Sequence, residues 1–300
     1  MEPDSRFLPT AQRLQPEELE LAARACVGLG IRHIRLTGGE PTLHPQLPLI
    51  ISRMARLDLD DLSMTTNGWR LDNDSLRNWH DHGLRRLTVS LDAVTDARFQ
   101  QLTRSSVSPQ QIIDGIRRAI ECGLGPVKVN AVIIRNWNED QVVPLASLAR
   151  KLDIEVRFIE FMPLDAGRHW SIDSVVPAAE ILDRIRSVFA LRELHSDDPA
   201  TTAIDFGFEE GSLGRIGLIA PVSRPFCGAC NRLRITADGK VRPCLFSTTE
   251  WDMLPLMRNG ASVRQIQEFL IDAVWTKQAG HGITSAAFER PERSMSAIGG

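Results

Sequence analysis

The chain has 300 residues, of which 43% are hydrophobic and 24% are charged, enough for one large or two modest domains with a buried core. A formal net charge of −3 argues against a general nucleic-acid-binding or membrane-binding surface. The first ten residues contain no apolar signal core, and no run of about 18 uncharged apolar residues follows. The sequence therefore predicts a cytoplasmic protein with neither nucleic acid nor membrane as partner.

The first half of the chain alternates amphipathic helical stretches with short apolar runs. Helical periodicity predicts helices at 17–28, 46–56, 74–82, 109–123 and 139–152. Strands are predicted at 33–37, 62–66, 86–91, 127–134 and 156–161. This alternation is typical of a parallel sheet with helical crossovers, either open or closed into a barrel. After residue 163 we expect a helix near 177–189, a polar, glycine-rich stretch to about 217, a cysteine hairpin, and a helix at 262–274.

Polar or non-packing residues follow four of the predicted strands. They are Thr37-Gly38-Gly39-Glu40, Thr65-Thr66-Asn67-Gly68, Ser90-Leu91-Asp92 and Met162-Pro163. Active sites of parallel α/β sheets and barrels lie at the carboxyl ends of the strands. The four ends therefore predict one shared pocket, where the Gly38-Gly39 backbone can approach a ligand closely.

Alternation along the strands places cations on the inner face of the predicted barrel. Arg35 and Lys128 both occupy positions opposite the apolar residues of their strands. Buried cations are costly without an anion, and together with Arg232 and Arg234 they could bind a polyphosphate. The alternative is internal ion pairing with an acidic residue, for example Glu40, Asp92 or Glu160.

Three cysteines, Cys227, Cys230 and Cys244, form a Cys-x2-Cys-x13-Cys pattern near the end of the chain. A hairpin through Ala237-Asp238-Gly239-Lys240 would bring the third thiol back beside the first two. Such thiolates bind zinc or an iron–sulfur cluster, and three ligands leave one position open for a substrate. The alternative is a structural zinc site that takes a distant histidine, such as His281, as its fourth ligand.

The remaining two cysteines do not add to this pattern. Cys26 lies in an apolar helical run and Cys122 precedes a glycine, so both are interpreted as ordinary buried or loop thiols. Five cysteines in a chain of this length do not make a disulfide framework, which agrees with a reducing compartment.

Taken together, these residues resemble the GTP 3′,8-cyclases of molybdenum cofactor biosynthesis, a family of radical S-adenosylmethionine enzymes. The resemblance covers nearly the whole chain. It is carried by the segments IRLTGGEP, TTNGWRL, TVSLD, VKVN, RFIEFMP, IGLIAPVSRPFC, CNRLRITADGKVRPCLF and the terminal Ile298-Gly299-Gly300.

The resemblance implies a partial (βα)6 barrel over residues 1–165 and a C-terminal iron–sulfur region over residues 166–300. It implies conversion of GTP to (8S)-3′,8-cyclo-7,8-dihydroguanosine 5′-triphosphate by a radical made from S-adenosylmethionine. A cyclic pyranopterin monophosphate synthase would use this product downstream. A homodimer is compatible with the resemblance, as is a Gly-Gly tail that enters the pocket.

The resemblance also assigns site residues. A [4Fe–4S] cluster would lie on Cys227, Cys230 and Cys244. GTP would be bound by Arg35, Thr66, Lys128, Arg232, Leu233 and Arg234. S-adenosylmethionine would be bound by Gly39, Ser90 and Met162, with Glu40 and Asn67 close by.

One feature of the family is not found in this sequence. The family's Cys-x3-Cys-x2-Cys motif and the first barrel strand would precede Met1, so a second [4Fe–4S] cluster is expected only where that segment is present. We interpret the chain as a cyclase whose start is misassigned or truncated. The alternatives are an inactive remnant that binds GTP and one cluster, a degraded gene product, a radical peptide-modifying enzyme, or a structural zinc-binding protein.

Overall fold

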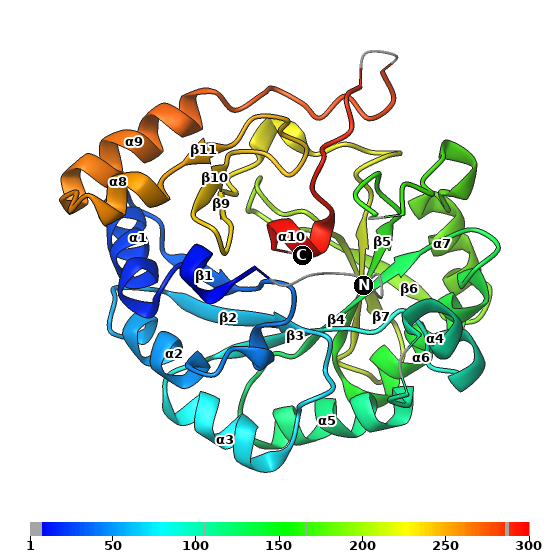
Figure 1. Ribbon diagram of the computed structural model, residues 1–300. Coiled ribbons are helices and arrows are strands. Elements are labelled where there is room, and N and C mark those ends of the chain that lie inside the picture. Colours follow the sequence, from blue (N-terminus) through cyan, green and yellow to red (C-terminus); the bar gives the residue numbers. More distant parts are fainter. Residues whose placement is uncertain (1–7, 105, 166, 286–287, 300) are drawn as a thin grey trace.

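The computed structural model describes residues 8–104, 106–165, 167–285 and 288–299. Figure 1 shows a sheet that curves into an incomplete barrel, with helices on its outer side and the C-terminal helix α10 on its inner side. Its parallel strands are β1 (His33–Leu36), β2 (Asp61–Thr66), β3 (Arg86–Ser90), β4 (Lys128–Ile133), β5 (Glu155–Glu160) and β8 (Arg215–Ile219). The parallel sheet predicted from the sequence is therefore confirmed, and all five predicted strands are present.

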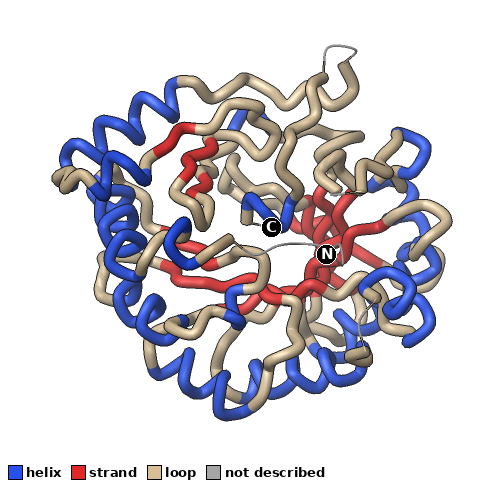
Figure 2. The backbone as a smooth tube through the Cα atoms, viewed as in Figure 1, coloured by secondary structure: helices blue, strands red, loops and turns tan. Residues whose placement is uncertain are grey.

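Helices connect the parallel strands and cover the outer face of the sheet, as Figure 2 shows. They are α1 (Pro16–Gly28), α2 (Leu47–Ala55), α3 (Asn73–Asp81), α4 (Asp96–Thr103), α5 (Pro109–Glu121), α6 (Val142–Leu152) and α7 (Ala178–Arg186). Local sequence sets their first turns. Ser108 caps α5 with Pro109 at its first position, and the Asp72 carboxylate accepts the backbone N–H of Ser75 at 2.9 Å to cap α3.

The alternation of side chains along β4 separates the core from the barrel interior. Val129, Ala131 and Ile133 are fully buried in the main core cluster under the helices. Lys128 and Asn130 occupy the alternate positions and therefore face the interior, as the sequence predicted. The helix-covered face supplies stability, and the opposite face is free to carry polar groups.

The stretch between α7 and residue 217 differs from the prediction. Two further strands, β6 (Leu191–Leu194) and β7 (Ile204–Phe208), continue the sheet beyond β8 in antiparallel pairing. The prediction of a polar, irregular stretch was wrong because Asp205 and Gly207 interrupt the apolar run. Phe206 and Phe208 are nevertheless buried in the main core. Helix α4 was also missed, because Phe99 is its single buried residue.

The C-terminal part adds a small sheet and three helices. The sheet contains β9 (Arg234–Ile235), β10 (Lys240–Arg242) and β11 (Trp251–Asp252), and the helices are α8 (Leu254–Arg258), α9 (Val263–Trp275) and α10 (Met295–Ile298). Strands β9 and β10 are antiparallel, which confirms the predicted hairpin.

A second core joins this part to the N-terminal helix. Ala22 and Cys26 of α1 are buried in one cluster with Ile266 and Leu270 of α9. Burial raises the pKa of Cys26 to about 11, so this thiol stays neutral and acts as an apolar side chain. Among the described residues, we find no helix that is both long enough and apolar enough to cross a membrane.

Candidate functional site

The carboxylate of Glu40 ties together the carboxyl ends of β1 and β2. Its Oε1 accepts the backbone N–H of Thr42 at 3.0 Å and the hydroxyl of Thr66 at 2.7 Å, and its Oε2 accepts the backbone N–H of Asn67 at 2.7 Å. Gly38 has a φ of 148° and no atom near the position of a Cβ, so the backbone here is open to a ligand. The predicted Thr66 therefore lies in the Glu40 network, where its hydroxyl is already engaged.

Glu160 has the equivalent role at the end of β5. This side chain is fully buried and accepts the backbone N–H groups of Ala178 at 2.8 Å, Val222 at 2.8 Å and Ser223 at 2.9 Å. Asp92, after β3, accepts the backbone N–H of Val132 at 2.8 Å. Glu40, Asp92 and Glu160 thus hold the rim of the barrel by bonding backbone groups. The idea that they neutralise the barrel cations was wrong.

Cations line the interior on the side of the sheet away from the helices. Arg35 Nε is 3.5 Å from the Ser63 hydroxyl. Burial, followed by repulsion from Arg157 and Arg86, lowers the pKa of Arg35. An anion bound beside this guanidinium would act in the opposite direction.

Lys128 has a carboxylate partner, but not one that the sequence analysis named. Its Nζ is 2.7 Å from Glu155 Oε2, and Glu155 also pairs with Arg157. Burial and repulsion from Arg157 lower the pKa of Lys128, although the ion pair with Glu155 opposes this. Glu155 thus pairs with two cations, and the Asp205 carboxylate also interacts with both of them electrostatically.

One interior cation was missed in the sequence. Arg157 alternates with the buried Val156 and Phe158 on β5, so the argument used for Lys128 could have found it. Asn130 Oδ1 is buried and has no hydrogen-bond partner among the described residues. A buried orphan acceptor beside a group of cations is typical of a polar ligand site.

The cysteine hairpin brings the thiols and arginines together. Cys227 and Cys230 bracket a single turn, η5 (Cys227–Ala229), and Cys244 follows β10. Arg232 Nε donates to Cys230 Sγ at 3.3 Å. Burial alone would raise the pKa of Cys230, but the hydrogen bonds and charge of Arg232 bring it down to about 7. The site therefore favours the thiolate form, which is the form that binds iron.

Arg234 lies deeper in the hairpin. Burial, and then repulsion from Arg232, lowers its pKa to about 10, while Cys230 and Cys244 act in the opposite direction. Both thiols are thus close enough to interact with one guanidinium group. These soft donors fit an iron–sulfur cluster. Among the described residues, no three His, Cys, Asp or Glu side chains gather around a common point for a metal ion, so the ligand set stays a prediction.

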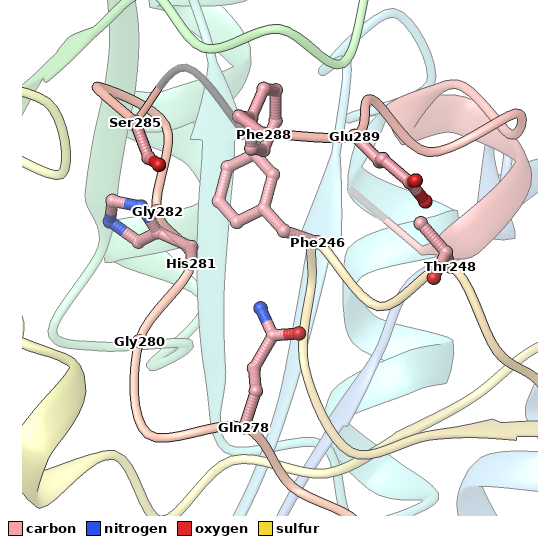
Figure 3. Close-up of a pocket in the computed structure, with 9 residues that line it drawn as sticks. All are labelled: Phe246, Thr248, Gln278, Gly280, His281, Gly282, Ser285, Phe288 and Glu289. Carbon is pink, nitrogen blue, oxygen red and sulfur yellow. The ribbon is translucent and has the colours of Figure 1, made fainter.

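A pocket of about 240 Å³ lies beside this hairpin, and Figure 3 shows the residues that line it. Gln278 lines the pocket, and its Nε2 is 3.6 Å from Cys244 Sγ. His281 also lines it and packs against Phe246, with ring centroids 5.1 Å apart. Burial lowers the pKa of His281, which keeps the ring neutral. Neutral imidazole is the form that binds zinc, but no three metal-binding side chains of the described residues gather here, so the alternative with His281 as fourth ligand stays a prediction.

The three residues predicted to bind S-adenosylmethionine lie at the ends of different strands. Gly39 follows β1, Ser90 is the last residue of β3, and Met162 follows β5. These positions are at the carboxyl rim, whereas Lys128 is the first residue of β4. Thr66, which is predicted to bind GTP, is the last residue of β2 and lies at the same rim.

The C-terminal tail enters the barrel. Ile298 is 1% exposed, and a Cβ on Gly299 would be 2.6 Å from the hydroxyl of Thr37, the residue that follows β1. Gly299 has a φ of 84°, which favours glycine at this contact. Gly300, the other residue of the predicted tail, lies outside the described residues.

Comparisons with known proteins agree with this architecture. The model of the radical SAM superfamily matches residues 2–149, and that of the Molybdenum Cofactor Synthesis C family matches residues 154–283. The structure of Streptococcus suis SuiB bound to S-adenosylmethionine has a TM-score of 0.64 at 13% identity, and the match covers 94% of this chain and 63% of SuiB. Fold and family models together define a radical SAM protein with a partial barrel.

Curated relatives give the family. A GTP 3′,8-cyclase of Rhodopirellula baltica is 41% identical over 303 residues, which cover 100% of this chain and 84% of the relative. A GTP 3′,8-cyclase of Streptomyces coelicolor is 40% identical, with 95% of this chain and 83% of the relative covered. The chain belongs to the GTP 3′,8-cyclase family.

Proposed function

We propose that this protein cyclises GTP to (8S)-3′,8-cyclo-7,8-dihydroguanosine 5′-triphosphate, the first step of molybdenum cofactor biosynthesis. The observation that carries the proposal is the cation-lined barrel interior, together with the arginine-rich cysteine hairpin at its side. Arg157 acts electrostatically on both Arg35 and Lys128, and Arg232 of the hairpin also acts on Arg35. The relatives named GTP 3′,8-cyclase support the same substrate.

Arg35 and Lys128 would bind the phosphates of GTP, and Arg157 would join them. Arginine presents a planar fork of donors that matches phosphate oxygens, and lysine adds a point charge. Burial and neighbouring cations lower the pKa values of Arg35 and Lys128, and a bound polyphosphate would offset both effects. Arg232, Leu233 and Arg234 would contact the guanosine end from the hairpin, and Thr66 would do so through its backbone, since Glu40 engages its hydroxyl.

Cys227, Cys230 and Cys244 would hold a [4Fe–4S] cluster, with one iron open toward the barrel. Gly39, Ser90 and Met162 would hold S-adenosylmethionine at the rim. When bound, S-adenosylmethionine and the iron–sulfur groups supply the radical chemistry, for which a second cluster on the family's upstream cysteines is required. The chain's own part is to hold two ligands in line and to keep water out.

We also propose a division of labour between residues 1–165, which would bind S-adenosylmethionine and the phosphates, and residues 166–300, which would bind the cluster on Cys227, Cys230 and Cys244. The two family models meet between residues 149 and 154, which supports a boundary in this region. We further propose a cytoplasmic location, a homodimer, and delivery of the product to a cyclic pyranopterin monophosphate synthase.

The test is anaerobic reconstitution with iron and sulfide, followed by GTP titration and product analysis. We expect iron uptake that is lost in Cys230→Ser, with correct GTP binding lost in the same variant. Cys26→Ser is the matched control, because that thiol is buried in the second core. In a form that carries the upstream cysteine motif, S-adenosylmethionine and reductant should give the cyclised product. GTP binding without product in that form would favour the inactive remnant.

A further inference from the structure

Two arginines anchor the C-terminal tail before it enters the barrel. Arg290 Nη2 is 2.6 Å from Asp165 Oδ1, and Arg293 donates to both carboxylate oxygens of Asp238, at 2.9 and 2.8 Å. Figure 1 shows the tail passing from the outer edge of the molecule to α10 on the inner side of the sheet. The two ion pairs thus hold the segment of the chain that leads to Gly299.

The carboxylate partners belong to two different parts of the chain. Asp165 follows β5 and Met162, whereas Asp238 lies in the turn between β9 and β10 of the cysteine hairpin. Arg293 is also 3.0 Å from Glu250, which pairs with the buried Arg242 of β10. A two-pronged, partly buried arginine–carboxylate pair fixes orientation as well as distance. Arg293 therefore connects the tail to the hairpin more rigidly than a single surface ion pair would.

Contacts beyond the anchors continue into the barrel. Met295 donates its backbone N–H to Leu164 O at 2.9 Å, and Ile298 is buried in one cluster with Leu164 and Phe246. Gly299 ends this path against Thr37. Thr37 lies two residues after Arg35 and two before Gly39, so the tail ends between the residues proposed for GTP and for S-adenosylmethionine.

We propose that Arg290 and Arg293 are positioning residues for the reaction. Arg290 fixes the tail to the barrel segment at Asp165, and Arg293 fixes it to the hairpin at Asp238. Through these pairs, the placement of Ile298 and Gly299 at Thr37 depends on a correctly folded cysteine hairpin. The catalytic consequence rests on the proposed cyclase function, but the anchoring geometry does not.

The anchoring is tested without substrate, by hydrogen–deuterium exchange of the peptide that covers residues 289–299. In Arg293→Ala we expect amide exchange in this peptide to become at least about ten-fold faster, since the charge-assisted pair is lost. Arg293→Lys keeps the charge but not the two-donor geometry of the guanidinium, so its exchange rate should be intermediate. This variant provides the test if the alanine variant does not fold. Arg264→Ala is the control, because this side chain is 87% exposed. Parental exchange in both Arg293 variants would overturn the proposal.

Turnover then tests the consequence in a form that carries the upstream cysteine motif. Arg293→Ala should lower kcat by about ten-fold or more and change KM for GTP less. Deletion of Gly299 and Gly300 should do the same, and the combined variant should be no worse than the deletion alone. If the combined variant instead lost kcat by the product of the two separate factors, Arg293 would not act through the tail. A parent form that makes no cyclised product would instead count against the proposed function and leave the exchange result standing.

Discussion

As Glu155 shows, carboxylates do not neutralise all the cations inside the barrel to the same extent. The Glu155 carboxylate neutralises part of the charge of Lys128 at 2.7 Å and also pairs with Arg157. Within the described part of the chain, Arg35 contacts the Ser63 hydroxyl, and the carboxylate of Asp61 acts on it from further away. A phosphate group would therefore gain more from Arg35 than from Lys128.

This difference predicts the effect of two substitutions on GTP affinity. Arg35→Ala should weaken GTP binding by about 1.5–3 kcal/mol, the usual range for a hydrogen bond to a charged group. Lys128→Ala should cost less, because Glu155 already takes up part of the hydrogen-bonding capacity of this ammonium group. Isothermal titration with GTP measures both, and Lys151→Ala at the exposed end of α6 is the control. Parental affinity in both site variants would contradict the phosphate assignment.

Sequence alone could place these cations but not their partners. Alternation along β1 and β4 put Arg35 and Lys128 on the inner face, because side-chain direction follows from the two-residue period. The partner of Lys128 is set by the register between β4 and β5, which pairs Lys128 with Glu155. Register is a tertiary property, so Glu155 could not be singled out beforehand.

At the scale of elements, the first half of the fold was predictable because each strand and helix has its own apolar period. Strands β6 and β7 were not, since Asp205 and Gly207 break the pattern and the strands depend on pairing with β8. The position of α10 could not be predicted from periodicity either. Four residues carry no helical signal of their own, and contacts at Leu164 and Thr37 position them.

Packing between α6 and the start of β8 leaves no room for a side chain at Gly214. A Cβ there would lie 2.3 Å from the carbonyl oxygen of Ala149, a backbone atom that cannot rotate away. Gly214→Ala should therefore destabilise the protein by about 1–3 kcal/mol. Urea unfolding should show a lower midpoint, whereas Gly280→Ala, which meets no atom within 4 Å, should not. Equal midpoints for the two variants would show that this close contact is absent.

The first turn of α7 gives a pH-dependent contribution to stability. Hydrogen bonds from Arg135 and Arg184 lower the pKa of Glu180 to about 2. Because the folded pKa lies below the unfolded value of 4.5, the contribution is present above pH 4.5 and is lost as the pH falls toward 2. The side chain is 33% exposed, so we expect about 1 kcal/mol or less.

Unfolding of Glu180→Gln measures this contribution. The variant should be less stable than the parent at pH 7, and the difference should shrink between pH 4.5 and 2. Glu268→Gln is the control, because the Arg264–Glu268 pair is much more exposed. A stability difference that stays constant down to the lowest pH would assign the effect to packing rather than to charge.

At the scale of the whole molecule, charge is distributed unevenly. The chain has a net charge of −3, yet Arg157 on the inner face of the sheet repels both Arg35 and Lys128. This repulsion occurs at a site where a bound anion would offset it. The local group of cations, rather than the net charge of the chain, therefore indicates an anionic ligand.

This arrangement predicts that polyanions stabilise the entire fold. A ligand at 100 times its Kd adds about 2.7 kcal/mol to the free energy of unfolding. GTP and inorganic tripolyphosphate should both raise the melting temperature by several degrees, and guanosine at the same concentration should not. Salt at about 0.5 M should reduce both shifts, because it screens the phosphate contacts. If guanosine stabilised the protein as much as GTP, recognition would come from the base at the hairpin, and the inner cations would have a structural role.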